Sequence, residues 1–431
     1  MRKKLISILV DGVSADTFEK HAHRLPNMRH LAERGLRVRR LKSAVPATSV
    51  PGRATMLTGV GPETHGIYGN HIFRGDASVA PLAEDLLVPT IATHARQAGL
   101  DVAAIGQALV NPRDTSVYVS PWWLRGFMTG YRFSKMVTPE ALAASRAIHD
   151  PEDRLAKAGL TEMDAFRDAA DGGAPHLISG LALDQFLNRA VVALLGSDRP
   201  PDLLLTEIEM PDAFQHYLGY DSPAGIWSVE FADMLIGNLL AVLERTGRRE
   251  DYVIAVASDH GHGFVDTAIF PEAIIPDMHW MTEGASLYVS LKAAGDLERV
   301  TERLLPYGVE LWNDHHVPEN LRGTVAMFVA PPRHSFEERP SDASGPLVAT
   351  GSPHLISTHG FRPGSPEDDR MFILSGGGIA PKVIKAADAD QFAPTLASVL
   401  GLPLEPYAGR SLIAEESPIA RSPQSLELHL K

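Results

Sequence analysis

Short apolar segments alternate along the chain with segments whose apolar residues recur every three or four positions. Leu5–Val10, Leu203–Met210 and Tyr252–Ser258 are rich in Ile, Val and Leu and do not alternate with polar residues. Such runs are typical of strands that helices cover on both faces. The spacing predicts helices at Leu25–Arg34 and Trp227–Arg245. Together these segments predict an α/β protein with a mainly parallel sheet.

An acidic residue follows each of the three predicted strands: Asp11, Asp212 and Asp259, the last followed directly by His260. In open α/β sheets, ligands bind beyond the carboxyl ends of the strands. We therefore expect these side chains to converge on one site.

Two stretches interrupt the alternation, and we expect both to be insertions on the face that carries the site. Residues 111–175 form the first and include Trp122 and Trp123, while residues 279–352 form the second. The two tryptophans suit either a wall for an aromatic ester group or a small core of the insertion itself. The catalytic core then comprises residues 1–110, 176–278 and 353–414, followed by a tail at 415–431.

The composition excludes several classes of function. The 431 residues include no Cys, which excludes disulfides, zinc ribbons, thiol nucleophiles and iron–sulfur clusters. The 40 Lys and Arg against 53 Asp and Glu leave a net charge of −13, which argues against binding of nucleic-acid polymers. An anionic substrate would need local positive charge, and metal ions are the obvious source of it.

The sequence indicates no membrane partner, because we find no apolar run near the length of a transmembrane helix. The basic start followed by apolar residues superficially resembles a secretion signal, but it lacks a small-residue cleavage site and runs into Asp11. We expect a cytoplasmic protein.

Pro46–Gly59 predicts a turn followed by a short helix, with Ser49 at its N-terminus. A Ser at this position is commonly only a helix cap. Its hydroxyl would also lie beside unpaired N–H groups and the positive end of the helix dipole, where phosphate binds. If a metal lowers the pKa of that hydroxyl, Ser49 becomes a nucleophile.

The spacing of Asp212 and His216 places both on one face of a helix, where they can bind the same ion. The whole candidate set suits two zinc-like ions: Asp11, Ser49, Asp212, His216, Asp259, His260 and His359. We interpret the other imidazoles nearby in the sequence as structural or solvent-facing: His262, His315, His316 and His354.

Five sequence blocks occur in the same order as in a known family. They are ILVDG (8–12), PATSVPGRATMLTG with PETHGIYGN (46–70), EMPDAFQHYLG (209–219), SDHG (258–261) and STHGF (357–361). The chain resembles the type I phosphodiesterase/nucleotide pyrophosphatase branch of the alkaline phosphatase superfamily. This resemblance implies an alkaline-phosphatase-like three-layer α/β/α sandwich with a mainly parallel central sheet and cap-like insertions. It also implies hydrolysis of phosphate esters through a phosphorylated Ser49.

The resemblance implies which residues hold each of two divalent ions, which we expect to be Zn, with Mn, Mg or Fe as alternatives. One ion would be bound by Asp11, Ser49, Asp259 and His260, and the other by Asp212, His216 and His359. Nucleotide-cleaving relatives usually carry Asn three residues after the nucleophile, where it donates to a phosphoryl oxygen. Gly52 stands there in this chain, so we expect its N–H or the side chain of Arg53 to bind the substrate phosphate. Thr48 is the rival nucleophile, but the spacing to the later blocks favours Ser49.

The predicted reaction is therefore hydrolysis of a small-molecule phosphodiester or nucleotide pyrophosphate. A phosphomonoesterase, a phosphonate hydrolase or a sulfatase would use the same site, and SVPGR (49–53) partly resembles the CxPxR setting of sulfatases. A non-catalytic protein that binds a phosphoryl ligand is an alternative of another class, against which the complete ligand set argues.

Overall fold

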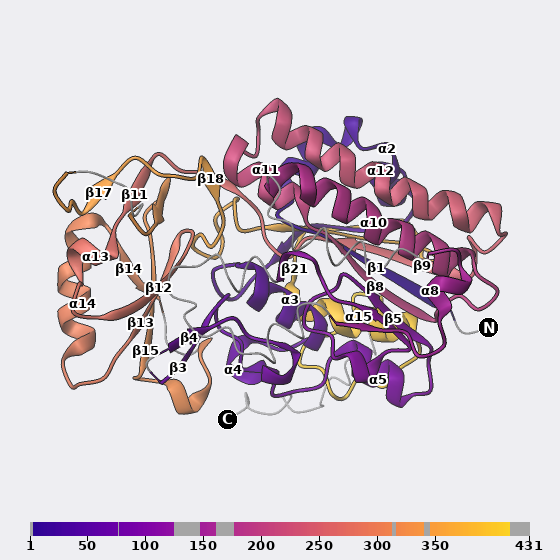
Figure 1. Ribbon diagram of the computed structural model, residues 1–431, viewed down its shortest axis with the longest axis horizontal. Helices are drawn as coiled ribbons and strands as arrows, with labels where there is room; N and C mark the ends of the chain where they lie inside the picture. Colours follow the sequence, from indigo (N-terminus) through magenta and orange to yellow (C-terminus); the bar gives the residue numbers. More distant parts are fainter. Residues whose placement is uncertain are drawn as a thin grey trace, which may run out of the picture.

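A central sheet flanked by helices forms the larger part of the molecule, and a smaller lobe lies beside it (Figure 1). The computed structural model describes residues 3–75, 77–124, 147–160, 176–312, 316–339 and 345–413.

Ten strands make up the central sheet, and its middle strands are parallel. Their order is β20 (Lys382–Ile384), β2 (Leu36–Lys42), β19 (Arg370–Gly376), β9 (Tyr252–Ala257), β1 (Lys4–Val10), β8 (Leu203–Ile208), β5 (Val102–Ile105), β6 (Val117–Val119) and β7 (Ile148–His149), with β21 (Ala387–Asp388) beside β2. β19 is antiparallel to both β9 and β2, and β7 is antiparallel to β6. The sheet is thus mainly parallel, as predicted.

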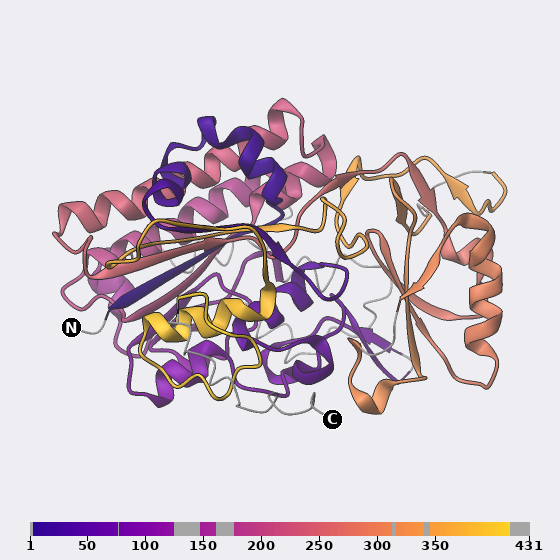
Figure 2. The same ribbon diagram turned by 180° about the vertical axis from the view of Figure 1, so that it is seen from behind.

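Helices cover both faces of this sheet, which gives three layers (Figures 1 and 2). One face carries α2 (Pro26–Arg34), α10 (His176–Gly196) and α12 (Pro223–Arg245), and the other carries α3 (Ser49–Thr58), α5 (Ile91–Gln97) and α15 (Phe392–Val399). Successive residues of β1 point to opposite faces, so Ile6 and Ile8 pack against the first group while Leu5 and Leu9 pack against the second. The predicted α/β/α sandwich is confirmed.

The predicted strands and helices occur close to their expected limits. The strand expected at Leu203–Met210 ends earlier, at Ile208. The reason is that α11 (Met210–Leu218) begins two residues later, with Pro211 in its first turn. β6 and β7 show that the described parts of residues 111–175 extend the central sheet. The remainder of that predicted insertion, and the tail at 415–431, lie outside the described residues.

The smaller lobe is built on a second, antiparallel sheet with its own apolar core. Its strands are β12 (His279–Glu283), β13 (Ser286–Ser290), β15 (Val325–Val329) and β14 (Glu310–Trp312), and α13 (Pro271–Ile274) and α14 (Asp296–Leu304) lie beside it (Figure 1). A three-stranded sheet adds β11 (Thr267–Ile269), β16 (His334–Phe336) and β17 (Thr350–Gly351). The lobe therefore contains the predicted insertion 279–352 and begins slightly before it.

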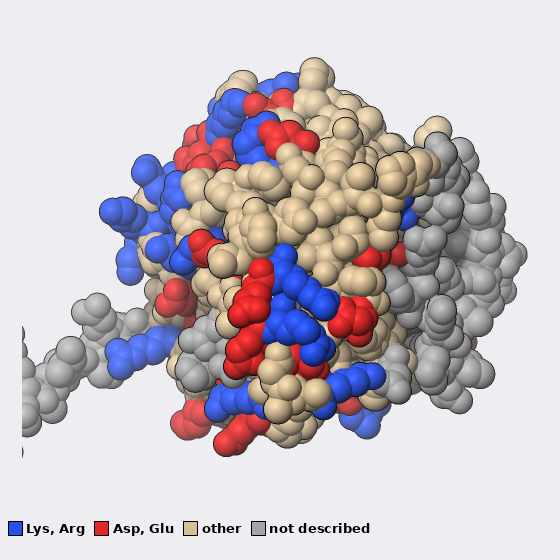
Figure 3. Space-filling view, turned by 90° about the vertical axis from the view of Figure 1, so that its left-hand side faces the viewer, with Lys and Arg blue, Asp and Glu red and all other residues tan. Residues whose placement is uncertain are grey.

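A two-stranded pair, β10 (Gly263–Phe264) with β18 (Ser357–Thr358), lies where the chain enters and leaves the lobe. The end of the molecule that the lobe forms carries acidic and basic side chains next to one another over its described surface (Figure 3). On α14, for example, Arg299 pairs with Asp296, and Arg303 pairs with Asp277. This mixed pattern forms no continuous basic surface on the described part of that face.

Two helices of the larger unit, α10 and α12, are long and apolar enough to cross a membrane by length and composition alone. In this structure 44% and 56% of their apolar windows are buried, with apolar side chains packed against the sheet. The same pattern is typical of helices that cover a sheet.

Asp233 ties two helices of one layer together. Its carboxylate accepts hydrogen bonds from the backbone N–H groups of Asn27 (3.1 Å) and Met28 (2.7 Å) at the start of α2. Leu25, the N-cap residue of α2, offers no side-chain acceptor. We expect Asp233→Ala to lower the free energy of unfolding by about 1–2 kcal/mol, measured as a shift in the urea midpoint. The exposed Lys20–Asp221 pair is the control, since Asp221→Ala should change stability much less; equal effects would contradict the capping role.

Candidate active site

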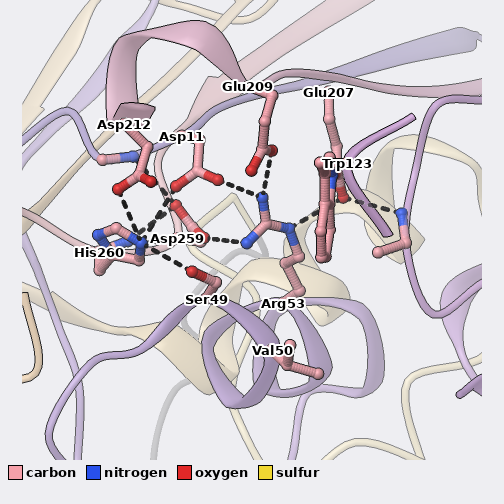
Figure 4. Close-up of polar contacts among 12 residues, drawn as sticks. Asp11, Ser49, Val50, Arg53, Trp123, Glu207, Glu209, Asp212, Asp259 and His260 are labelled. Carbon is pink, nitrogen blue, oxygen red and sulfur yellow. Dashed lines mark hydrogen bonds and ion pairs between the residues drawn. The ribbon is translucent and has the colours of Figure 1, made fainter. Parts of the chain in front are cut away.

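The parallel strands bring the predicted acids together at one edge of the sheet (Figure 4). Asp11 follows β1, Asp259 follows β9, and Asp212 lies in the first turn of α11, just after β8. Because β1 pairs in parallel register with both β8 and β9, their carboxyl ends coincide. Asp11 has carboxylate oxygens within 4.8 Å of ligand atoms of both other acids. The predicted convergence is thus present.

The residues predicted to hold the first ion lie around His260. Its Nε2 atom is 3.1 Å from Oγ of Ser49, 3.1 Å from Oδ1 of Asp11 and 3.6 Å from Oδ2 of Asp259. Ser49 is the first residue of α3 and Thr48 is the N-cap, so the hydroxyl of Ser49 is directed at this cluster rather than capping the helix. All four predicted residues therefore share one location.

The residues predicted to hold the second ion form an adjacent group. Asp212 and His216 lie one turn apart on α11, with Oδ1 and Nε2 separated by 3.4 Å. His359 completes the group, with its ring centroid 5.1 Å from that of His216. Oδ1 of Asp212 is also 3.7 Å from Nε2 of His260, so the two groups adjoin.

The hydrogen bonds of the imidazoles favour cations in both groups. Nδ1 of His216 lies 2.9 Å from the carbonyl oxygen of Ser357, and Nδ1 of His260 lies 3.0 Å from that of Gly261. A carbonyl only accepts, so each Nδ1 carries a hydrogen, and in the neutral ring each Nε2 presents a lone pair toward carboxylate oxygens. Metal-binding histidines are held in this way. Oδ1 of Asp11 and Nδ1 of His359 are buried without hydrogen-bond partners, which fits the same reading.

The site collects more negative charge than its own side chains balance. The site contains five carboxylates and one guanidinium, that of Arg53, which pairs with four of them. With all five acids ionised, four negative charges remain: Asp11, Glu207, Glu209, Asp212 and Asp259 are the acids. Burial alone would lower the pKa of His260, but Asp259 and Asp11 raise it to about 9. Burial raises the pKa of Asp259 to about 7, despite the opposing effect of Arg53. Two divalent cations would match the four charges, so the residues present fit such ions.

Arg53 lies at the centre of the carboxylates rather than at the surface (Figure 4). It is one turn after Ser49 on α3, and its guanidinium bonds to Asp11 (2.6 Å), Glu207 (3.1 Å), Glu209 (3.0 Å) and Asp259. Its side chain is fully buried, and the ring of Trp123 lies 5.0 Å from its Cζ atom. Arg53 was one of two groups expected to bind the substrate phosphate, and for Trp123 a substrate wall and a small core were both open; in the structure the two side chains pack on each other and contact these acids.

Gly52 also has a partner other than the predicted phosphate. Its N–H donates to the carbonyl oxygen of Thr48 (2.9 Å) within α3. A Cβ atom at this position would lie 2.6 Å from the backbone oxygen of Asp259. Glycine therefore lets the N-terminal turn of α3 approach the end of β9, which a larger residue such as Asn would prevent in this arrangement.

Sequence reasoning missed three members of the site. Glu207 lies in β8 and Glu209 directly follows it. Two acids beside apolar strand residues are a sequence signal that a cation pairs with them, because buried carboxylates are costly when unpaired. His262, interpreted as structural or solvent-facing, is buried with Nε2 2.8 Å from Oδ1 of Asp212. Burial lowers its pKa to about 4. His354 is exposed and His316 stacks on Trp312 in the lobe, while His315 lies outside the described residues.

Solved structures with a similar fold define the fold class of this chain. An inactive variant of murine ectonucleotide pyrophosphatase/phosphodiesterase 5 in complex with AMP matches with a TM-score of 0.66 and 16% identity, covering 95% of this chain and 97% of that one. The human protein of the same name matches with a TM-score of 0.66 and 17% identity, covering 94% and 97%. The fold is therefore of the alkaline phosphatase type.

The family model of type I phosphodiesterases/nucleotide pyrophosphatases matches residues 5–373, and the chain belongs to this family. An uncharacterised pyrophosphatase/phosphodiesterase of Schizosaccharomyces pombe is 25% identical over 263 residues, which are 60% of this chain and 44% of that protein. The chain thus matches less than half the length of this curated relative.

The Arg53 cluster makes a prediction about stability. Removing the cation from a buried charge network leaves uncompensated carboxylates, so Arg53→Met should lower the free energy of unfolding by about 3–5 kcal/mol. Arg40→Met is the matched control, because Arg40 pairs with Asp369 and Asp16 at a half-exposed position and should contribute about 0–1 kcal/mol. Urea unfolding in the presence of a chelator measures both; similar losses for the two variants would show that Arg53 does not compensate the acids.

Proposed function

We propose that the protein is a metal-dependent hydrolase of small phosphodiesters or nucleotide pyrophosphates that reacts through Ser49. The observation that carries this proposal is the position of the Ser49 hydroxyl, at the N-terminus of α3 and 3.1 Å from Nε2 of His260 among the candidate metal ligands. The family supplies the class of reaction.

We propose two bound divalent cations, with zinc preferred by the mixture of imidazole and carboxylate ligands. Asp11, Ser49, Asp259 and His260 would hold one, and Asp212, His216 and His359 the other. Such ions supply Lewis-acid stabilisation of phosphoryl oxygens and lower the pKa of a bound hydroxyl or water.

Ser49 would act as the nucleophile in two balanced steps. Its Oγ gives up its hydrogen and forms a bond to phosphorus while the bond from phosphorus to the leaving oxygen breaks and that oxygen takes up a proton. This gives phosphorylated Ser49, whose phosphorus still carries the second ester group, and releases one alcohol or nucleotide. Water then attacks phosphorus, the bond to Oγ breaks, and the hydroxyl of Ser49 is restored. Ser49 is partly exposed and lies at the positive end of the α3 dipole, which favours an anion there, whereas Thr48 is fully buried.

The charge around Ser49 supports a diester rather than a monoester substrate. A monoester dianion needs additional positive charge at its terminal oxygens. Arg53, the guanidinium one turn from Ser49, is already paired with four carboxylates and has no exposed surface. A diester or pyrophosphate linkage places less charge on the reacting phosphorus, so the cations alone can balance it. A phosphomonoesterase would need a fixed cation at the terminal oxygens of its substrate, and Arg53 does not offer one.

Ser49→Ala tests the nucleophile. We expect the variant to lose at least about 10³-fold in kcat, because the attacking group is gone, while mass spectrometry of the eluted metal shows an almost unchanged metal content. Ser49→Thr is the control, since it keeps the hydroxyl and should retain most of the activity. Chelation should abolish wild-type turnover, and added zinc should restore it. Full turnover by the Ala variant would refute the assignment.

A second test compares kcat/KM for bis-p-nitrophenyl phosphate and p-nitrophenyl phosphate on the zinc-loaded protein. We expect the diester to be preferred by at least about tenfold, which corresponds to about 1.4 kcal/mol in the activation free energy. A preference for the monoester would mean that another cation reaches the substrate, and the phosphatase alternative would replace the proposed function.

A further inference from the structure

His262 is not among the metal ligands that the family resemblance implies. Its contacts are nevertheless with those ligands, which a purely structural role does not explain. It follows β9 by a few residues, in the SDHGH segment, and its side chain is 1% exposed. Its ring centroid is 4.6 Å from that of His216 and 5.7 Å from that of His260. It therefore adds an imidazole to the group around Asp212.

The hydrogen bonds of Ser357 determine which nitrogen of His262 carries a hydrogen. The hydroxyl of Ser357 donates its only hydrogen to the carbonyl oxygen of Gln215, at 2.5 Å. Its Oγ atom can then only accept from Nδ1 of His262, at 3.2 Å. Nδ1 is thus the protonated nitrogen, and Nε2 presents its lone pair to Oδ1 of Asp212 at 2.8 Å.

The same serine holds His216 in the same tautomer. Its carbonyl oxygen accepts from Nδ1 of His216, whose Nε2 also faces Oδ1 of Asp212, at 3.4 Å. One carboxylate oxygen is therefore approached by the lone pairs of two neighbouring imidazoles. A single cation satisfies these atoms together, whereas protons would place separate positive charges on two rings 4.6 Å apart.

The distances match a shared ion. A tetrahedral zinc site with bonds of about 2.0–2.2 Å places its ligand atoms roughly 3.3 Å apart, close to the 2.8 Å and 3.4 Å separations from Oδ1 of Asp212. His262 offers a ligand atom within 4.8 Å of atoms of both Asp212 and His260, so it lies where the two groups adjoin. Gly12, with φ of 72°, leaves room for this approach, because a Cβ there would lie 2.9 Å from Cδ2 of His262.

We infer that His262 is an additional metal ligand, which binds through Nε2 the ion that Asp212 holds, with Ser357 fixing its tautomer. The inference rests on the proposed metal centre. It makes this centre richer in imidazole than the set of Asp212, His216 and His359 alone, and so favours zinc or cobalt over magnesium.

Cobalt substitution tests the inference without relying on activity. We expect His262→Gln to weaken the binding of one of two Co²⁺ ions by more than about 100-fold, beyond the 10–100-fold loss typical of residues that only support a ligand, and to change the visible absorption of the bound Co²⁺. Ser357→Ala keeps the backbone carbonyl that holds His216, so it should cost only about 10–100-fold. His65→Gln is the control, because His65 is equally buried but bonds to Thr55 and Ile67.

An unchanged cobalt spectrum and affinity in His262→Gln would overturn the inference while leaving the proposed function intact. If the wild-type protein itself binds no Co²⁺ or Zn²⁺, the proposed function fails instead. A measurement on the wild-type protein covers the case in which the variant does not fold. Nitrogen-15 NMR of the histidine rings should show that zinc shifts ring-nitrogen signals of four imidazoles, His216, His260, His262 and His359; a His262 ring whose signals zinc leaves unchanged would not be a ligand.

Discussion

Repulsion among five buried or partly buried carboxylates at one edge of the sheet is the constraint on which the rest of the site depends. Parallel strands end at the same edge, so the acids that follow β1, β8 and β9 are brought together by the topology itself. Burying such charges is costly unless each is paired. Arg53 supplies one fixed positive charge, and Trp123 covers it from solvent. The approach of α3 that carries Arg53 inward requires Gly52, because any Cβ there would meet the backbone of Asp259.

The smaller lobe contributes to the same site through His359. The turn between β12 and β13 packs on the segment that carries this residue: the N–H of Ala285 donates to the carbonyl oxygen of His359 (2.9 Å), and the hydroxyl of Ser286 donates to that of Gly360 (2.7 Å). The β10–β18 pair places Ser357 beside α11. The lobe is therefore a support for the imidazoles of the second group as well as an insertion in the chain.

The sequence was sufficient to predict the elements whose pattern is local. The apolar runs ending in Asp11 and Asp259 predicted β1 and β9, and the i,i+4 spacing predicted that Asp212 and His216 share a helix face. The partners of Arg53 were not predictable in this way. Helical spacing shows which residues share a face of α3, but it does not show which residues of other elements that face packs against. The tautomer of His262 depends on Ser357, which is distant in sequence. β6 and β7 are too short to show any periodicity.

Arg53 and the proposed metal ions would have separate tasks in this arrangement. Arg53 takes Oδ2 of Asp11, which leaves Oδ1 directed at Nε2 of His260 and available to an ion. On Asp259, Oδ1 accepts from the backbone N–H of His260 at 3.0 Å, while Oδ2 faces both Arg53 and Nε2 of His260. The guanidinium thus orients the two carboxylates and, being fully buried, presents no exposed donor to a substrate. Under the proposed function, positive charge for a phosphoryl group at Ser49 would come from bound ions and the dipole of α3 rather than from Arg53, which would link the electrostatic demand of the substrate to the occupancy of the metal sites.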